Sequence, residues 1–375
     1  MNAEEARAIG RRLKRIRYTR GKSLQVVAEL AGMSKSQLDR IERGEVALDR
    51  LSEIVALARV LEISPSDLMR LPVPAPGNGH IDRIVEAVRD ALAAVDWDEP
   101  GGQVLPVNVL RIRVRQMRQM PRRYADVGEA LPGLIRDLHT SIAAGRDVAE
   151  LLALTVKVHT QITHMWLRLA GAPTDLRRNA TTLAWTAAQE SGDAALLGTA
   201  TYGGVYALVN CGLFDLAHAA LDSLMLPATT PDTVGLIGSL AITRAWVASL
   251  RQQPGDVVAP MHAAAELAQR YGEATGDDAF GFAFGPTDVG LYSMALALDS
   301  DDPDLTLSIA EGLHPERHPY SARQAAYWVD CGRALVRLPG RQHDAARAFR
   351  RAESISPHHV HRNPLVREVI VGLPR

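Results

Sequence analysis

The spacing of apolar residues along the chain restricts its fold more than any other feature. Apolar positions recur at i, i+3 and i+4 almost everywhere, as in residues 81–95 and 105–120, and no long segment alternates apolar with polar residues. The first pattern places apolar side chains on one face of an α-helix, whereas a half-buried strand would need the second. The sequence therefore predicts an all-α protein, and its 375 residues are enough for two or three domains with sizeable cores.

A Pro- and Gly-rich stretch divides the chain. Residues 71–79, LPVPAPGNG, place prolines at alternate positions, which favours extended backbone, and end in a flexible Gly-Asn-Gly. We predict a domain at 1–70, a linker at 71–79 and a larger helical domain at 80–375. Residues 1–70 hold 14 basic and 10 acidic side chains, although the formal net charge of the chain is -1. Local charge is therefore more informative about partners than the total.

Several patterns bear on the compartment and on chemistry. No signal-like segment or run of the roughly 18 apolar residues that span a bilayer is visible. Two cysteines without CxxC spacing, Cys211 and Cys331, are expected in the core of a protein in a reducing compartment. We expect a cytoplasmic protein without membrane contact, metal or cofactor, and not an enzyme, because no phosphate loop, nucleophile elbow or zinc-protease motif occurs. The histidines interpreted as surface loop residues are His314, His318, His358, His359 and His361.

Residues 4–70 divide into five short helical segments whose ends carry capping residues. Ser23 precedes the second segment and Ser34 the third, and a serine hydroxyl in that position accepts a hydrogen bond from the helix backbone. Gly32 suits the tight turn between them, and Gln37 is placed to complete a capping box with Ser34. The residues expected to pack the second segment across the third are Val27, Ala28, Leu30, Met33, Leu38 and Ile41.

The turn and the third segment resemble the helix-turn-helix domain of the Xre family, the phage-repressor-like regulators. The resemblance covers residues 9–70 and implies a five-helix, lambda-repressor-like domain that binds double-stranded DNA. It is carried by small, apolar and charged residues at fixed offsets, namely Val27, Ala28, Ala31, Gly32, Met33, Ser34, Leu38, Ile41, Glu42, Arg43 and Gly44.

The resemblance implies that the third segment lies in the major groove, where its N-terminal residues face base edges and its exposed basic residues face phosphates. Lys35, Ser36 and Arg40 are then the candidates for base contacts, since lysine and arginine can donate to guanine O6 and N7. Gln37 could contact adenine, although its capping role competes. The remaining candidates, for phosphate contact or nonspecific attraction, are Ser34, Arg43, Arg11, Arg12, Arg15 and Lys22.

The larger domain carries a weak internal repeat. In DAARAFRRAESISP, the small-large-small pattern of Ala345, Phe349 and Ala352 before Pro357 matches the second helix of a tetratricopeptide repeat. A poorer copy lies at 212–227. These patterns predict a tetratricopeptide-like α-solenoid, and a non-repetitive helical bundle is the alternative. Together with the linker, the segments 101–114 and 280–298 resemble actinobacterial Xre-type regulators that join such a domain to the DNA-binding domain.

The concave face of a solenoid commonly forms a groove for a ligand or peptide. Candidate lining residues are polar or aromatic residues within apolar helices, although each alone is more often a core residue than a lining residue. They are Tyr202, Tyr206, Asn210, Arg244, Trp246, Phe284, Thr287, Tyr327 and Trp328. An unpaired polar group would be costly in such surroundings, which favours a function for Asn210 and Arg244. Thr287 or Asp288 could also N-cap the helix that follows Pro286.

These observations lead to two hypotheses. The first is a homodimeric transcription regulator that binds a two-fold operator and senses a small molecule or peptide through its helical domain. Two-fold operators are expected because one recognition helix covers too few base pairs for useful specificity. The alternative is an interaction scaffold or anti-regulator whose helical domain binds a protein partner.

Overall fold

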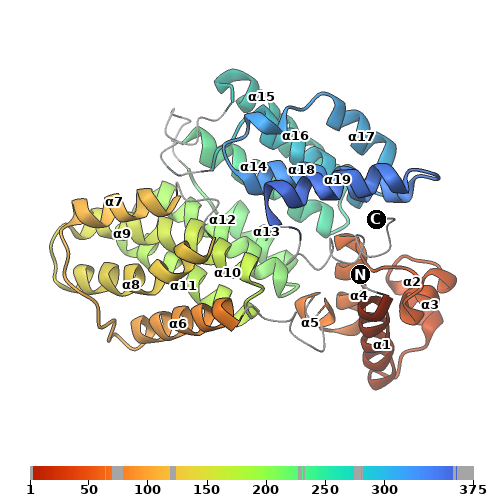
Figure 1. The fold of residues 1–375 in the computed structure, drawn as a ribbon, viewed down its shortest axis with the longest axis horizontal. Helices are drawn as coiled ribbons and strands as arrows, with labels where there is room; N and C mark the ends of the chain where they lie inside the picture. The colour runs from red at the N-terminus through yellow and green to blue at the C-terminus, as the bar shows by residue number, and fades with distance from the viewer. Residues whose placement is uncertain are drawn as a thin grey trace.

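The protein, described by a computed structural model, is helical throughout the residues that the structure describes, and these contain no strand (Figure 1). They are residues 3–63, 65–69, 79–118, 124–226, 230, 233–273, 280, 282–357 and 360. The N-terminal helices are α1 (Ala3–Thr19), α2 (Leu24–Leu30), α3 (Lys35–Arg43), α4 (Leu51–Leu61) and α5 (Pro65–Met69).

The larger part continues the all-α fold that the sequence predicts. Its elements are α6 (Gly79–Asp96), α7 (Val107–Arg118), α8 (Tyr124–Ala143), α9 (Val148–Lys157), the π-helical turn η1 (Val158–Thr163), α10 (His164–Ala170), α11 (Thr174–Ser191), α12 (Ala194–Asn210), α13 (Phe214–Asp222), α14 (Val234–Leu250), α15 (Gly255–Tyr271), α16 (Pro286–Asp299), α17 (Pro303–Glu311), the 3-10 turn η2 (Pro315–Arg317), α18 (Ser321–Arg337) and α19 (Gln342–Ile355). The predicted linker lies outside the described residues except for Gly79, which begins α6.

The five N-terminal helices enclose an apolar core of their own, which includes Leu13, Leu38 and Leu57. The predicted caps are confirmed. The Ser23 hydroxyl accepts from the Val26 amide at 3.2 Å, and the Ser34 hydroxyl accepts from the Gln37 amide at 3.1 Å.

Two details of this domain differ from the sequence prediction. The Gln37 side chain does not complete a capping box; it donates instead to the Glu53 carboxylate of α4 at 2.6 Å. Leu30 was expected to pack α2 onto α3, but it is 64% exposed because it lies on the outer face of a helix of only seven residues.

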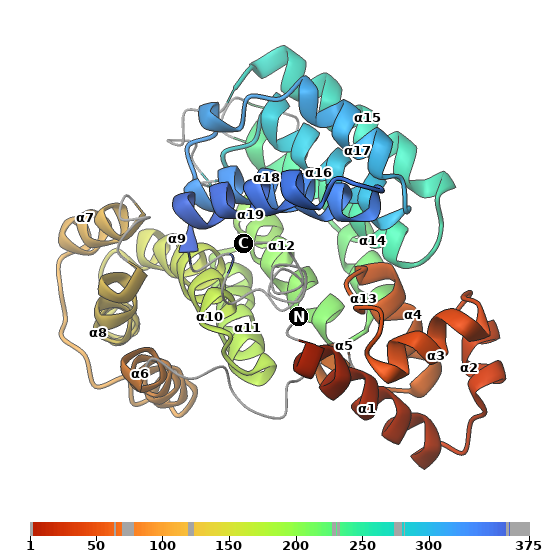
Figure 2. The same ribbon diagram turned by 45° about the vertical axis from the view of Figure 1, so that its right-hand side comes forward.

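Consecutive helices of the larger part pair through short connections. Contacting pairs are α11 with α12, α14 with α15, α16 with α17, and α18 with α19 (Figures 1 and 2). In α19 the repeat residues Ala345, Phe349 and Ala352 are all buried, and Gly332 of α18 leaves room for the Phe349 ring, which would lie 2.7 Å from an added Cβ. The helix ends at Ile355, before Pro357. Close helix packing at the predicted repeat is therefore present.

The N-terminal domain contacts the larger part directly through α4, which lies beside α14 in Figure 2. Val55 of α4 is buried in one apolar cluster with residues of α12, α13 and α14. At the start of α4, Arg333 Nη2 donates to the Asp49 carbonyl oxygen at 2.8 Å, and Arg337 lies 3.4 Å from the Asp49 carboxylate. Arg50 pairs in turn with Asp301 at 3.1 Å.

Three side chains lie in surroundings that test the sequence predictions. Cys331 is buried as expected, but Cys211 is only half-buried, in a crevice between α4 and α13. His318 was expected on a surface loop and is 2% exposed, because α18 packs against the turn that carries it and Asp288 of α16 lies 3.7 Å from its Nε2 atom. No helix in the described parts of the chain is long and apolar enough to cross a bilayer.

Candidate nucleic-acid interface

Two glycines bring α3 close against α1. A Cβ at Gly10 would lie 2.4 Å from the Ile41 carbonyl oxygen, so no larger residue fits where the helices cross. Gly44 caps α3 in the left-handed region, at φ 70°, and a Cβ there would lie 2.6 Å from the Arg7 amide nitrogen. Glycine is therefore favoured at Gly44 for two separate reasons, backbone conformation and space. Together these contacts fix the position of α3.

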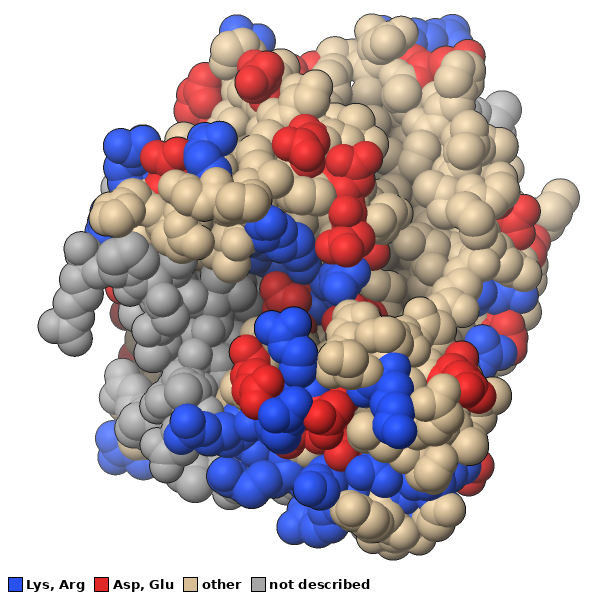
Figure 3. Space-filling model, turned by 90° about the vertical axis from the view of Figure 1, so that its right-hand side faces the viewer, with Lys and Arg blue, Asp and Glu red and all other residues tan. Residues whose placement is uncertain are grey.

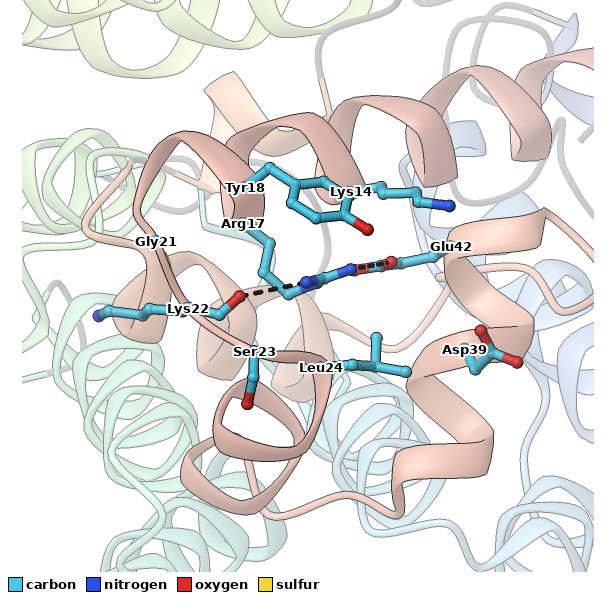
Figure 4. A pocket seen from close by; sticks show the side chains of 9 residues that line it. All are labelled: Lys14, Arg17, Tyr18, Gly21, Lys22, Ser23, Leu24, Asp39 and Glu42. Atoms are coloured by element: carbon cyan, nitrogen blue, oxygen red, sulfur yellow. Dashed lines mark hydrogen bonds and ion pairs between the residues drawn. The ribbon is translucent and has the colours of Figure 1, made fainter.

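A buried ion pair also joins α1 to α3. Arg17 Nε donates to Glu42 Oε1 at 2.6 Å and Nη2 donates to Oε2 at 2.9 Å, while Nη1 donates to the Lys22 carbonyl oxygen at 3.1 Å. The two side chains are only 7% and 3% exposed. Figure 4 shows the pair between α1 and α3, below Tyr18 and Lys14. Sequence reasoning missed this pair, although Glu42 directly follows the buried Ile41 in a helix with a single apolar face.

With the inner face of α3 held in this way, its outer face is left to solvent. Ser34, Lys35, Ser36, Arg40 and Arg43 are all exposed. Figure 3 views the molecule from the side of the N-terminal domain and shows Lys and Arg side chains gathered across the lower part of that face. The exposed basic residues of α1 and α3 are Arg7, Arg11, Lys14, Arg15, Lys35, Arg40 and Arg43.

The basic residues of α3 are weakly engaged with acidic neighbours. Arg43 lies 2.7 Å from Asp39 and 2.8 Å from Glu45, and Arg40 lies 3.9 Å from Glu45. All of these side chains are about half exposed, and exposed pairs of this kind contribute only about 0–1 kcal/mol. A phosphate could therefore displace the carboxylates at small cost.

Two other predicted DNA contacts have partners elsewhere in the domain, and a third is half-buried. The Lys22 ammonium donates to the Val60 carbonyl oxygen at 2.5 Å and lies 3.4 Å from Glu62, so it ties the turn before α2 to the end of α4. Gln37 is half-buried and bonded to Glu53, which restrains it from a base contact. Arg12 is half-buried on α1.

A cavity of about 560 Å³ lies beside the buried ion pair (Figure 4). Its lining residues come from α1, the following turn, α2 and α3, and they are Lys14, Arg17, Tyr18, Gly21, Lys22, Ser23, Leu24, Asp39 and Glu42. Because the lining carries both cations and carboxylates, the cavity has no evident preference for an anion. Among the described residues no cluster of three His, Cys, Asp or Glu could hold a metal ion.

In the larger part, several of the predicted ligand residues lie together. The Tyr202 and Tyr206 hydroxyls of α12 lie 3.3 Å apart, and the Tyr206 ring stacks on Trp246 with 4.8 Å between ring centroids. Asn210 is one turn further along α12 and donates to the Tyr206 carbonyl oxygen at 2.7 Å. Tyr292 of α16, which the sequence did not single out, joins them with its hydroxyl 2.7 Å from that of Tyr206.

Other candidates have packing contacts elsewhere. Arg244 Nη2 donates to the Leu221 carbonyl oxygen at 2.6 Å, near the end of α13. The Phe284 ring fills the space that Gly238 leaves open, since an added Cβ would lie 2.2 Å from it. The hydroxyl of Tyr327 donates to a carbonyl oxygen of α17 at 3.1 Å, and its ring meets Trp328 edge-on.

The predicted N-cap of α16 is wrong. The helix begins at Pro286 with Gly285 as its N-cap, and no side chain of the cap residue bonds the helix. Thr287 lies inside the first turn, where its hydroxyl donates to Glu273 at 2.7 Å and its amide lies 3.2 Å from the same carboxylate. Asp288 is buried and lies 3.3 Å from Arg323 of α18. A carboxylate from another segment therefore caps this helix end.

Comparisons with known proteins bear on the N-terminal domain. A family model described as a helix-turn-helix domain matches residues 8–71, from within α1 to just beyond α5. The HTH-type transcriptional regulator SinR of Bacillus licheniformis is 34% identical over 87 residues, which amount to 23% of this chain and 78% of that regulator. No solved structure matches the chain.

Proposed function

The chain belongs to the helix-turn-helix transcriptional regulators of the Xre type, and from this premise we propose that it binds a two-fold DNA operator as a homodimer through α3. The observation that carries the proposal is the placement of α3. Its start is capped by Ser34, its inner face is held by Gly10, Gly44 and Glu42, and its outer face is exposed and basic. A recognition helix needs this combination of a fixed position and a free outer face.

The individual roles follow from position and exposure. Lys35 and Ser36 occupy the first turn of α3, from which a recognition helix contacts base edges. Arg40 is one turn further along and can donate two hydrogen bonds to guanine. Arg43, in the last turn, is assigned to a phosphate, which would replace Asp39 and Glu45 as its partner.

The experiment is a selection of bound sequences from random DNA with the full-length protein, followed by fluorescence anisotropy on the enriched operator. Arg40→Ala should cost about 1–3 kcal/mol on the operator and relax specificity at one base pair. Arg43→Ala should weaken all sequences alike and reduce the salt slope by about one. Arg178→Ala, on α11, is the matched control. Equal losses from the first two variants on operator and scrambled DNA would contradict the assignment, and no enrichment at all would favour an interaction protein.

We also propose that the larger part senses a small molecule or peptide and acts on the N-terminal domain by direct contact. The half-buried Tyr202, Tyr206 and Trp246 support a binding site. The bonds of Arg333 and Arg337 to Asp49 support a route to α4. In this proposal the whole chain is a regulator and not an enzyme.

A further inference from the structure

The outer face of α3 carries an acidic side chain among its basic ones. Helix α3 contains two acidic residues, Asp39 and Glu42, and Glu42 is buried in its pair with Arg17. The Asp39 side chain is 46% exposed. Since residues four apart share one face of a helix, Asp39 lies between Lys35 and Arg43 on that face. A carboxylate is therefore placed in the middle of the surface assigned above to the major groove.

In the free protein, Asp39 and Glu45 share the guanidinium group of Arg43. Arg43 Nη2 lies 2.7 Å from Asp39 Oδ2, and Arg43 Nη1 lies 2.8 Å from Glu45 Oε1. The two acidic side chains are equally exposed, at 46% each. They differ in position, because Asp39 is in the second turn of α3 whereas Glu45 follows the C-cap residue Gly44. The two residues therefore allow a matched comparison between a carboxylate within the helix and one beyond its end.

Both carboxylates would lose this partner when Arg43 binds a phosphate. A recognition helix contacts base edges mainly through its N-terminal turns, so Asp39 is carried to the bases and Glu45 is not. A carboxylate that gives up its water and its cation at such an interface is costly unless other hydrogen-bond donors replace them. Asp39 therefore needs a donor from the base pairs.

The donors that base pairs present in the major groove narrow the choice. Cytosine offers its N4 amino group and adenine its N6 amino group, whereas guanine and thymine offer acceptors there. Adenine N6 stands beside the acceptor N7, which repels a carboxylate, and cytosine N4 stands beside a C–H group. We propose that Asp39 accepts a hydrogen bond from cytosine N4, a role that rests on the operator binding proposed above. Asp39 then specifies one C·G base pair in each half of the operator.

A purely structural role for Asp39 would have different consequences. Figure 4 shows its carboxylate apart from the buried pair of Arg17 and Glu42, so it takes no part in holding α3 against α1. An exposed ion pair between residues four apart on a helix contributes little to stability, and Glu45 offers Arg43 a second carboxylate. If Asp39 served only as a partner of Arg43, removing its charge and removing that of Glu45 would affect DNA binding in the same way.

The test repeats the selection from random DNA with full-length Asp39→Asn and Glu45→Gln. Each variant removes one negative charge beside Arg43, so both should bind scrambled DNA more tightly, by up to about fivefold. Asp39→Asn should also change the selected sequence. Its preference for cytosine should fall by about fivefold or more, with a gain for adenine, because asparagine can bond adenine N6 and N7. Glu45→Gln, the matched control, should select the wild-type operator.

A modified operator isolates the contact itself. Replacing the specified cytosine by 2-pyrimidinone removes its N4 amino group and leaves the rest of the base in place. The resulting loss of affinity, measured by anisotropy, should be about fivefold or more larger for the wild type than for Asp39→Ala, which has no carboxylate to accept the bond. The weaker base pair affects both proteins alike and cancels in this comparison.

Two results would overturn the proposal. One is an unchanged base preference in Asp39→Asn, and the other is an equal loss of affinity for the modified operator in the wild type and in Asp39→Ala. Either result, obtained with an operator that the wild type enriches, rejects the role of Asp39 and leaves operator binding standing. If the wild type enriches no sequence, operator binding and the role of Asp39 are both rejected.

Discussion

Replacing Glu42 by Gln tests whether the buried ion pair holds α3 in place. The change removes the negative charge beside a guanidinium that is 7% exposed, and it leaves one acceptor oxygen where Arg17 now donates to two. Breaking a buried pair by removing one partner costs about 3–5 kcal/mol, because the other charge stays buried. A small domain has a total stability of only about 5–15 kcal/mol. The variant should therefore lose about a fifth or more of the stability of the N-terminal domain.

Hydrogen exchange of the intact chain can measure this loss locally. Residues 1–70 contain no tryptophan, so exchange of peptides from α1 and α3 is a better probe than intrinsic fluorescence. A loss of about 3–5 kcal/mol should speed exchange there by about two to four powers of ten and leave peptides from α18 and α19 unchanged. Glu45→Gln is the matched control, since it removes an exposed carboxylate on the same side of the domain and should cost under about 1 kcal/mol.

A double variant separates charge from packing. Arg17→Met combined with Glu42→Leu removes both charges and keeps apolar volume, and replacing a whole buried pair in this way is often neutral or stabilising. It should therefore be more stable than Glu42→Gln alone. Two results would refute the reasoning. One is equal hydrogen exchange in α1 and α3 for Glu42→Gln and Glu45→Gln. The other is a stability loss in the double variant as large as the losses from Arg17→Met and Glu42→Leu added together.

Three further predictions concern the glycine cap of α3, the Asp49 ion pair and two histidines of the larger part. Gly44→Ala should destabilise α3 and weaken operator binding, measured by anisotropy, much more than Gly32→Ala. Both glycines have φ near +70°, but only at Gly44 would an added Cβ meet backbone atoms, at 2.6 Å. Similar effects of the two variants would contradict this. Asp49→Asn should speed hydrogen exchange in α4 by about fivefold and leave exchange in α1 unchanged. The fivefold change corresponds to about 1 kcal/mol for the partly buried pair of Asp49 with Arg337. Unchanged exchange in α4 would show that the contact with the larger part does not depend on this carboxylate. Burial lowers the pKa of His164, in α10, to about 3 and that of His139, in α8, to about 4. Both rings are neutral in the fold, so their contribution to stability is complete above about pH 6.5 and is lost as the pH falls toward 4, at up to about 1.4 kcal/mol per pH unit for each histidine. A melting temperature that is flat between pH 7 and 4 would contradict this.

Features set by local sequence were predictable from the sequence. The caps at Ser23 and Ser34 depend on residues three positions apart, and the exposed face of α3 follows from the apolar spacing of Leu38 and Ile41. Such contacts form within one helix turn, so composition and spacing determine them.

Features set by distant segments were not predictable in this way. Gln37 was assigned to a capping box because the sequence does not show that Glu53, 16 residues away, offers a carboxyl oxygen as acceptor. The cap of α16 likewise comes from Glu273 and not from the adjacent Thr287. Tyr206 was singled out as a polar group in an apolar helix, but its hydroxyl partner Tyr292 is 86 residues away. Tertiary packing determines which hydrogen-bond partner each of these side chains has, and the local sequence does not distinguish between the candidates.

The positions of α12 and α18 explain how a ligand bound in the larger part could act on DNA binding. Helix α18 carries Arg323, which donates to the Tyr292 hydroxyl at 2.9 Å, in its first turn and Arg337, which lies 3.4 Å from Asp49, at its end. These 14 residues span about 21 Å of helix. Helix α12 carries Tyr206, whose hydroxyl bonds that of Tyr292, and Gly212 just after it lies close to the N-terminal domain, since a Cβ there would meet Pro65 at 3.3 Å. A ligand that changes the contacts of Tyr206 and Tyr292 would therefore favour one placement of both helices, and through them one placement of α4. The effect cannot exceed the difference in ligand affinity between the two placements, and couplings of this kind are typically about 1–3 kcal/mol.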